Sequence, residues 1–460
     1  MEYRGIVEGT PVFLDSQMRP VEWLCAWFRQ LSYENSDPKT MKSYAYIVRR
    51  LVEFLAKRGA DLGTVTEADL VAFRRSRTEL QKVPVDDGTW DRDAVVINLM
   101  YTFFQEQGYV RRKPVRMKRN GGNGLSSGVQ REMDVRHMTV EQYLYFRDVG
   151  LGGQLPGAEI NESFRGWAPH RSKAGLELAL LTGMRKQEWS TLLLPEIGEG
   201  WRNPGEPVEF DLQECAKYKH HREVYIPTAA LETVGNYCLL ERAEMVERSA
   251  RALAGKAKDL FVVETVDIEQ GKLKGVDRGR RRTFTISAMG PDLRRRTVRE
   301  CEGGLEALAV FVGHGGLLLG PSSWDRIRKD AWRRMREHSA NEQAPPLPRK
   351  AWRFHDARHT FALQLLKYLM GLVAEQDAVR AKANGLPTVG DHIAFNPLLV
   401  LQRRLGHKWL SSTYTYLRYL EDPMNYIDDA FRAWSEHDGA TYSEIALRAL
   451  EGEGPDAASR

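Results

Sequence analysis

The stretch LGHKWLSSTYTYLRYL, residues 405–420, decides how this chain is interpreted, because three tyrosines in six positions follow a Gly-His pair. Tyr414, Tyr416 and Tyr419 are compatible with the aromatic face of a core helix. One of them is also a candidate nucleophile. A tyrosine hydroxyl has a pKa of about 10, so it needs a neighbouring base or cation before it can attack. The remaining sequence must therefore show whether such partners exist.

Two upstream motifs contain suitable partners. In TGMRKQE, Arg185 directly follows a Thr-Gly helix break, and in HDARHTFA, His355 and Arg358 are three residues apart, on one face of a helix. With His407 they form a set that suits metal-free attack on a phosphodiester. Guanidinium groups hold phosphate oxygens bidentately and stabilise the extra negative charge of the transition state. A lysine or histidine must also protonate the leaving alkoxide.

The distribution of charge indicates a polyanionic partner. The chain has a net charge of +5, but Glu421–Arg460 contains ten acids and three arginines, which leaves the first 420 residues at +12. A distributed positive surface favours nucleic acid, although each basic cluster alone is compatible with a solvated helix face. The clusters are RRKPVRMKR at 111–119, RGRRR at 278–282, RRR at 294–296 and WDRIRKDAWRRMRE at 324–337.

Other classes of protein are disfavoured. The chain has no run of about 18 apolar residues, and its N-terminus lacks the layout of a signal peptide. The cysteines are scattered, without a CxxC motif or metal-ligand spacing, and indicate free thiols in a reducing compartment. We therefore expect a cytoplasmic, nucleoid-associated protein without a membrane partner, metal or cofactor. The four cysteines are Cys25, Cys215, Cys238 and Cys301.

At 460 residues the chain exceeds what one hydrophobic core usually supports, so we expect two domains. Helix signals dominate the first: Asp37 as N-cap with Pro38 after it, and Thr66 with Asp69 around the start of the next helix. The second shows mixed signals, which predicts a mostly α fold with a small β component. The predicted segments are an extension (1–19), a helical domain (20–110), a basic linker (111–135), a mixed catalytic domain (136–425) with an enlarged β-rich insertion (257–322), and an acidic tail (426–460).

The motifs resemble those of the tyrosine recombinases, or phage integrases. That family has TG-hydrophobic-R-x-x-E, then H-x-L-R-H-T-F-A, then LGH with a tyrosine nine residues after the histidine. This chain has TGMRKQE, HDARHTFA and LGH in the same order. Counting from His407 selects Tyr416 over Tyr414 and Tyr419. The family's lysine lies on a β-hairpin, and AKYKHHREVYIP resembles that hairpin with Lys217 at the matching place and Lys219 as the alternative.

The resemblance covers roughly residues 20–425 and implies a core-binding domain and a catalytic domain that clamp double-stranded DNA. It implies a site-specific recombinase of a mobile element, acting in integration, excision or transposition without metal or ATP. Tyr416 would form a 3′-phosphotyrosyl intermediate while Arg185, Arg358 and His407 hold the phosphate. His355 would assist proton transfer and Lys217 would protonate the leaving oxygen. Glu188 and His359 are interpreted as supporting residues.

Two features depart from the family. The 257–322 region is longer than in a minimal member, and Ala357 replaces the usual leucine. We also find no separate arm-binding domain ahead of residue 20. The acidic tail is predicted to dock on a neighbouring subunit of a homo-tetramer, and an assembly that also contains other recombinase subunits is the alternative. Two alternatives stay open: a telomere resolvase or type IB topoisomerase with the same chemistry, and a non-catalytic DNA-binding protein on the same fold.

Overall fold

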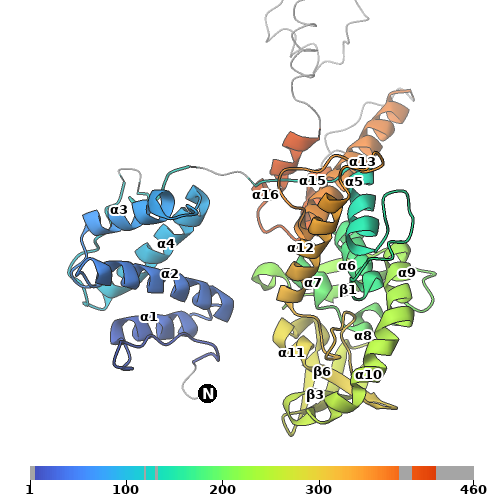
Figure 1. The fold of residues 1–460 in the computed structure, drawn as a ribbon, viewed down its shortest axis with the longest axis horizontal. Helices are drawn as coiled ribbons and strands as arrows, with labels where there is room; N and C mark the ends of the chain where they lie inside the picture. Colours follow the sequence, from blue (N-terminus) through green and yellow to red (C-terminus); the bar gives the residue numbers. More distant parts are fainter. Residues whose placement is uncertain (1–5, 119–120, 130–132, 383–395, 421–460) are drawn as a thin grey trace, which may run out of the picture. The chain divides into compact units, whose positions relative to one another are not determined.

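The computed structural model describes residues 6–118, 121–129, 133–382 and 396–420. The chain forms two compact units, Met1–Glu132 and Met133–Arg460, each of which is described separately (Figure 1). Both are dominated by helices, and two small sheets belong to the second unit. The predicted fold class, mostly α with a small β component, is confirmed. No helix within the described residues combines the length and apolar character needed to span a membrane.

The first unit is all-helical. The predicted N-caps form: Asp37 accepts a hydrogen bond from the backbone N–H of Lys39, and Thr66 and Asp69 make a reciprocal capping box. Large aromatic side chains, including Trp90 and Phe104, are fully buried in its core. The helices are α1 (Glu22–Tyr33), α2 (Pro38–Lys57), α3 (Glu67–Arg75), the π-helical turn η1 (Ser76–Leu80) and α4 (Asp87–Glu106).

Part of the segment that the sequence indicates as a linker packs on this first unit. Val115 and Leu125 are buried in the helical core. The indole N–H of Trp90 donates to the carbonyl of Leu125 over 2.7 Å, and Asp91 accepts hydrogen bonds from Ser127. Two apolar residues therefore hold part of residues 111–135 on the helical core. Glycine and serine content alone predicted a linker over the whole segment, which is longer than the part left free of this core.

In the second unit, helices both precede and follow the β1–β2 hairpin along the sequence. The predicted capping box of Thr139 and Gln142 is present at the start of α5. Its helices are α5 (Val140–Tyr145), η2 (Phe146–Leu151), α6 (Pro169–Thr182), α7 (Lys186–Ser190), α8 (Leu194–Ile197), η3 (Lys217–Lys219), α9 (Thr228–Tyr237), η4 (Cys238–Arg242), α10 (Ala243–Ala254), η5 (Ala257–Asp259), η6 (Ile286–Ala288), α11 (Pro291–Arg295), α12 (Pro321–Glu337), α13 (Phe354–Lys382), α15 (Pro397–Leu405), α16 (Ser411–Tyr414) and η7 (Thr415–Tyr419).

The two sheets differ in their relation to the sequence motifs. The predicted hairpin forms from β1 (Val208–Leu212) and β2 (Arg222–Ile226), which pair antiparallel with Val208 opposite Ile226. The 257–322 insertion folds into a five-stranded sheet with strand order β5-β4-β3-β6-β7. Only the β3–β6 pair is parallel. Its strands are β3 (Phe261–Asp267), β4 (Lys272–Asp277), β5 (Arg280–Thr285), β6 (Thr297–Cys301) and β7 (Gly304–Ala307).

The prediction that each basic cluster forms an exposed DNA-contact surface is wrong for part of one cluster. In the RRR run at 294–296, Arg294 is fully buried and makes a bidentate ion pair with Glu196, with N–O distances of 2.5 and 2.7 Å. Arg296 pairs with Asp277. A run of like charges indicated an exposed surface, but two of its arginines fold inward to meet carboxylates that lie far away in the sequence.

Candidate active site

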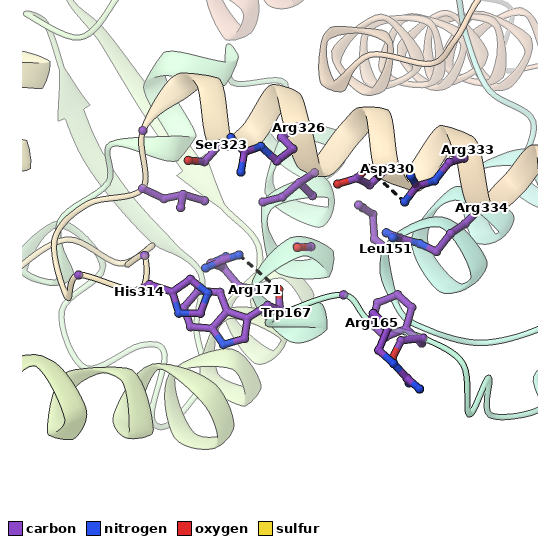
Figure 2. Close-up of a pocket in the computed structure, with 18 of the residues that line it drawn as sticks. Leu151, Arg165, Trp167, Arg171, His314, Ser323, Arg326, Asp330, Arg333 and Arg334 are labelled. Atoms are coloured by element: carbon purple, nitrogen blue, oxygen red, sulfur yellow. Dashed lines mark hydrogen bonds and ion pairs between the residues drawn. The ribbon is translucent and has the colours of Figure 1, made fainter.

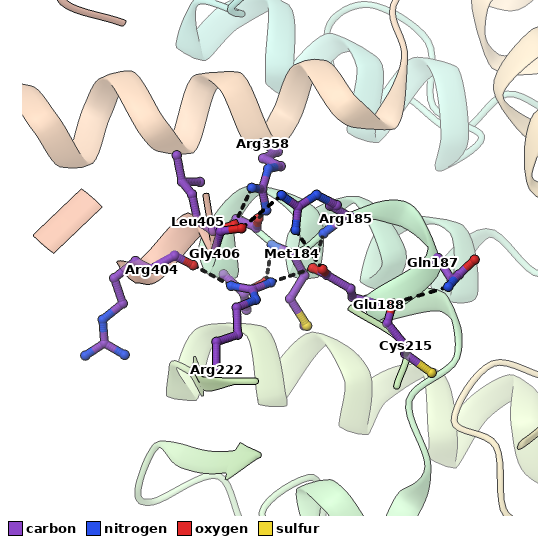
Figure 3. Close-up of polar contacts among 12 residues, drawn as sticks. Met184, Arg185, Gln187, Glu188, Cys215, Arg222, Arg358, Arg404, Leu405 and Gly406 are labelled. Atoms are coloured by element: carbon purple, nitrogen blue, oxygen red, sulfur yellow. Dashed lines mark hydrogen bonds and ion pairs between the residues drawn. The ribbon is translucent and has the colours of Figure 1, made fainter. Parts of the chain in front are cut away.

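The C-terminal end of α15 holds three arginines from three other elements. Backbone carbonyls there accept hydrogen bonds from Arg222 (at Arg404), Arg358 (at Leu405, 2.5 Å) and Arg185 (at Gly406, 3.3 Å) (Figure 3). The last carbonyls of a helix have no partner within the helix and carry the negative end of its dipole, so they suit cations.

The two glycines of the TG and LG motifs make this arrangement possible. Gly183 ends α6 and Gly406 ends α15, both in the left-handed conformation, with φ of 63° and 58°. A left-handed residue closes a helix and turns its last carbonyls outward, which favours glycine. The carbonyl of Gly183 accepts a second hydrogen bond from Arg358. The motifs therefore position an arginine through backbone geometry.

Glu188 is the one carboxylate at the centre of this cluster, and it is fully buried. Its Oε1 lies 3.0 Å from Nη1 of Arg185 and its Oε2 lies 2.5 Å from Nη2 of Arg222. Burial alone would raise the pKa of Glu188, but Arg222, Arg358 and Arg185 outweigh it and lower that pKa. Three guanidinium groups against one carboxylate leave an excess of two positive charges.

Arg358 is the most buried of these three arginines. It is 1% exposed, and its partners are the two carbonyls described above. Burial, then repulsion from Arg185, lowers its pKa to about 9, with Glu188 acting in the opposite direction. The side chain is therefore still charged at neutral pH, and it is held where an incoming anion would gain most from it.

Tyr416 lies in the adjoining core, and of the three tyrosines it alone is buried. Its side chain is 0% exposed and packs among apolar residues of α13 and α15, whereas Tyr414 and Tyr419 are 48% and 41% exposed. Of the two roles predicted for Tyr414 and Tyr419, core or interface aromatics, their exposure excludes the core. Burial raises the pKa of Tyr416 to about 12, and Arg358 and Arg185 oppose that shift. Its hydroxyl thus needs these cations close by to become a nucleophile.

His359 makes the direct contact with that hydroxyl. Its Nδ1 lies 2.9 Å from Oη of Tyr416, and the histidine is 2% exposed. Sequence reasoning gave His359 only a supporting role. A signal was present, because His355 and His359 are one helical turn apart and their rings stand 4.7 Å apart, edge to face. Burial, followed by His355 and Arg358, lowers the pKa of His359 to about 3.

His355 and His407 complete the group. The side chain of His355 is exposed; desolvation and then Arg358 lower its pKa to about 4. The ring of His407 is parallel to that of Tyr416 with centroids 6.2 Å apart, and its Nδ1 lies 3.0 Å from Oγ1 of Thr413. Burial and Arg358 lower the pKa of His407 to about 3. All three histidines, including His359, are therefore neutral at pH 7.

The structure thus brings together Arg185, His355, Arg358, His407 and Tyr416. The predicted lysine lies on the connection between β1 and β2, where Lys217 is exposed and Lys219 pairs with Glu214 over 2.8 Å. The catalytic roles of all six residues stay predictions. Among the described residues, no group of three or more His, Cys, Asp or Glu side chains could hold a metal ion.

Sequence reasoning missed Arg222. This residue is the first of β2, where the alternating burial of the strand places it inward with Val224 and Ile226. The two-residue period of HREVYIP contained this signal, because it places Arg222 on the same side of the strand as Val224 and Ile226. Arg222 also borders a cavity of about 580 Å³ next to His407. Its lining is rich in basic side chains: His220, His221, Arg222, Arg403, Arg404, His407 and Lys408.

Comparisons with known proteins give fold likenesses only. No family model matches the chain, and no curated protein matches it. Among solved structures, the XerH site-specific recombinase bound to a palindromic difH substrate is 13% identical, with a TM-score of 0.45 over 92% of this chain and 91% of that one. The Tn1549 transposon integrase with circular intermediate DNA is 12% identical, with a TM-score of 0.45 over 93% and 98%. A lambda integrase dimer bound to a core site is 14% identical, with a TM-score of 0.43 over 87% and 95%. At these values the likenesses carry no argument about activity, which must come from the site itself.

Proposed function

We propose that this protein is a site-specific tyrosine recombinase that cuts and rejoins double-stranded DNA through a 3′-phosphotyrosyl intermediate. The observation that supports it most strongly is the excess of buried arginines beside a buried tyrosine. Two unmatched positive charges suit a phosphodiester, and suit still better the doubly charged pentacoordinate state formed when a hydroxyl attacks it. A purely structural cluster would have no use for this excess.

In the proposed reaction, Tyr416 attacks the scissile phosphorus and its oxygen forms the new ester bond. The bond to the 5′-oxygen breaks, and that oxygen leaves as a hydroxyl after taking a proton. Attack by the same or a partner 5′-hydroxyl reverses the step, so the bond energy is conserved in the phosphotyrosine. Arg185, Arg358 and His407 hold the non-bridging oxygens. Neutral histidines donate one N–H each without adding charge to the free site.

Proton transfer is assigned to groups near each end of the displacement. Lys217, or alternatively Lys219, protonates the leaving oxygen, and His355 assists from the exposed side of α13. His359 positions the tyrosine hydroxyl through the 2.9 Å hydrogen bond. Because Tyr416 is fully buried in the free protein, we also propose that the η7 turn moves when DNA binds, so that the hydroxyl reaches the phosphate.

We place the protein in the cytoplasm, on the nucleoid, as a homo-tetramer on paired DNA sites of a mobile element. The acidic tail predicted for residues 426–460 lies outside the described residues. It remains a proposed docking segment between subunits, and its deletion should weaken pairing of two DNA sites while sparing binding to one.

A trapping experiment tests the chemistry. The substrate is a randomised pool of nicked duplexes, in which cleavage releases a small fragment that carries the leaving hydroxyl. Because this fragment diffuses away, the strand cannot be rejoined and the cleaved DNA stays attached to the protein. The wild-type protein should form a covalent adduct that survives denaturation, and sequencing the attached DNA would identify the site and the cleavage position. Tyr416→Phe should form no adduct, whereas Tyr414→Phe and Tyr419→Phe should form it. An adduct that survived Tyr416→Phe would mean that another residue is the nucleophile.

The complete burial of Tyr416 favours one second candidate, a DNA-binding protein that retains the fold without catalysis. A protein of that kind would bind duplex DNA but form no adduct with any member of the pool. Joining of the trapped strand to a separately labelled duplex would in turn distinguish a recombinase from a telomere resolvase or topoisomerase, which rejoin within one DNA molecule.

A further inference from the structure

A second polar cavity lies in the Met133–Arg460 unit, lined by none of the residues proposed for catalysis. It has a volume of about 920 Å³ and opens between α12 and the loops before α6 and α12 (Figure 2). Its volume falls within the usual range for small-molecule sites. The GHGG run at 313–316, which lacks the spacing of a phosphate-binding P-loop, borders this cavity through Gly313, His314 and Gly315.

Six cations line this cavity, and five of them have no carboxylate partner among the residues that the structure describes. The exception is Arg333, which pairs with Asp330 at 3.4 Å and Glu337 at 3.7 Å, the two carboxylates of the lining. The side chains of Arg326 and Lys256 make no hydrogen bond or ion pair with any other residue in the part of the chain that the structure describes. The full set of cations is Arg165, Arg171, Lys256, Arg326, Arg333 and Arg334.

Arg171 is the residue that most clearly indicates an anionic ligand. It is 2% exposed, and its guanidinium donates only to the carbonyls of Val312 (3.0 Å) and Trp167 (3.4 Å). Its Nε is buried and has no hydrogen-bond partner among the described residues. The carboxylate of Glu241, whose charge acts on Arg171, accepts hydrogen bonds from the backbone N–H groups of His170 and Arg171 and makes no ion pair with the guanidinium. A buried cation that makes no ion pair is costly, so its retention points to an anionic ligand.

A flat aromatic surface lies beside this arginine. The rings of Trp167 and His314 are stacked with centroids 3.3 Å apart, and both side chains are exposed toward the opening. The guanidinium of Arg171 lies 4.8 Å from the centre of the Trp167 ring. Aromatic faces of this kind stack on planar rings, while arginines hold phosphate oxygens. Figure 2 shows Arg326 on the α12 side, opposite the Trp167–His314 pair.

We propose that this cavity binds a nucleoside phosphate, either a free nucleotide or the 5′-phosphorylated end of a DNA strand. The phosphate lies between Arg171 and Arg326, and the base stacks on an outer face of the Trp167–His314 pair. The proposal concerns a site separate from the one that would carry out strand transfer, so it stands or falls independently of Tyr416.

Isothermal titration calorimetry on the full chain with the Tyr416→Phe substitution tests it. The probes are AMP, adenosine, inorganic phosphate and a trinucleotide with or without a 5′-phosphate. AMP or the phosphorylated trinucleotide should bind more tightly than adenosine or the unphosphorylated trinucleotide. Arg326→Gln should weaken this binding by about tenfold, the effect of one lost charge-assisted hydrogen bond. Arg336→Gln, on the same helix but outside the cavity lining, should leave it unchanged.

Trp167→Ala tests the stacking surface and should reduce AMP to the affinity of inorganic phosphate. Binding of AMP alone identifies a free nucleotide as the ligand, and binding of the phosphorylated trinucleotide alone identifies a strand end. Three results would overturn the proposal: no probe binds at millimolar concentration, adenosine binds as tightly as AMP, or Arg326→Gln and Arg336→Gln weaken binding equally. Thermal melting of each variant shows that it is folded before titration.

Discussion

Glu188 and Glu196 are two buried glutamates from the same stretch of sequence, and they face arginines in different proportions. Glu196 meets one arginine, Arg294, in a bidentate pair, and the remaining N–H groups of Arg294 donate to carbonyls of Met289, Thr191 and Ile286. Glu188 is shared by Arg185 and Arg222 and lies near Arg358. The first cluster is charge-balanced and complete, whereas the second has two positive charges in excess.

This difference separates a structural arginine from one suited to binding an anion. Arg294 joins α11 to α8 and has no unused hydrogen-bonding capacity, so a phosphate would gain nothing there. The arginines around Glu188 are held mostly by carbonyls at helix ends, which orient a cation without cancelling its charge. The ratio of arginines to carboxylates, and not burial, is therefore the feature that distinguishes a cluster suited to anion binding from a structural one in this unit.

The largest effect on stability is expected from Arg294→Gln. Removing the one cation beside Glu196 leaves a buried carboxylate without a counter-charge, which costs about 3–5 kcal/mol of unfolding free energy. Chemical denaturation monitored by tryptophan fluorescence measures it. Trapping of DNA per folded molecule should not change. Adding Glu196→Gln should recover part of the loss, and if the double variant is no more stable than the single one, the two side chains do not act as a pair.

Arg358→Gln should show the opposite behaviour. Loss of a preorganised group that stabilises the transition state is expected to slow adduct formation by about 10²–10³-fold, or roughly 2.7–4 kcal/mol. Unfolding free energy should fall less than in Arg294→Gln, because two guanidinium groups still balance Glu188. Single-turnover cleavage and denaturation on the same preparation measure both quantities. Equal destabilisation in the two variants would remove the distinction between the clusters.

A smaller, pH-dependent effect is expected from His359. Its pKa is lowered to about 3 in the folded protein, against about 6.5 in an unfolded chain, so below pH 6.5 the unfolded state binds a proton that the folded state does not. Stability should therefore decrease as pH falls, for this residue by about 1 kcal/mol between pH 6.5 and 5.5 and by about 1.4 kcal/mol per pH unit below that window. The contribution of His359 is measured by comparing the unfolding free energy of His359→Asn and wild type between pH 6.5 and 5.5. If the free energy of both proteins changes equally with pH, the prediction is wrong.

The sequence allowed prediction of features that depend on local spacing. The capping residues Asp37, Thr66 and Thr139, the β1–β2 hairpin and the mixed second unit all follow from short-range patterns. Counting from the LGH motif also selected the one tyrosine that is buried beside the arginines. Each of these predictions depends on patterns that extend over no more than about twenty residues.

Partners distant in the sequence could not be predicted in this way. Arg222 reaches Glu188 across 34 positions, Arg294 reaches Glu196 across 98, and His359 reaches Tyr416 across 57. Nothing in a run of arginines shows which member turns inward, because that depends on where the fold brings a carboxylate or a carbonyl. The arrangement of the five-stranded sheet was unpredictable for the same reason.

The smallest effect is expected from Lys219→Ala, which extends the comparison to an exposed pair. Lys219 meets one carboxylate, Glu214, and both are partly or largely exposed, so its loss should change unfolding free energy by less than about 1 kcal/mol. As a cation already matched by an anion, it should resemble Arg294 and leave adduct formation within about twofold of wild type. Lys217→Ala is the matched variant, and it should slow cleavage of an ordinary 5′-oxygen bond far more than cleavage of a 5′-thio bond, whose leaving group needs no proton. If Lys219→Ala shows that selective defect instead, Lys219 is the general acid, and its ion pair with Glu214 in the free protein does not exclude a catalytic role.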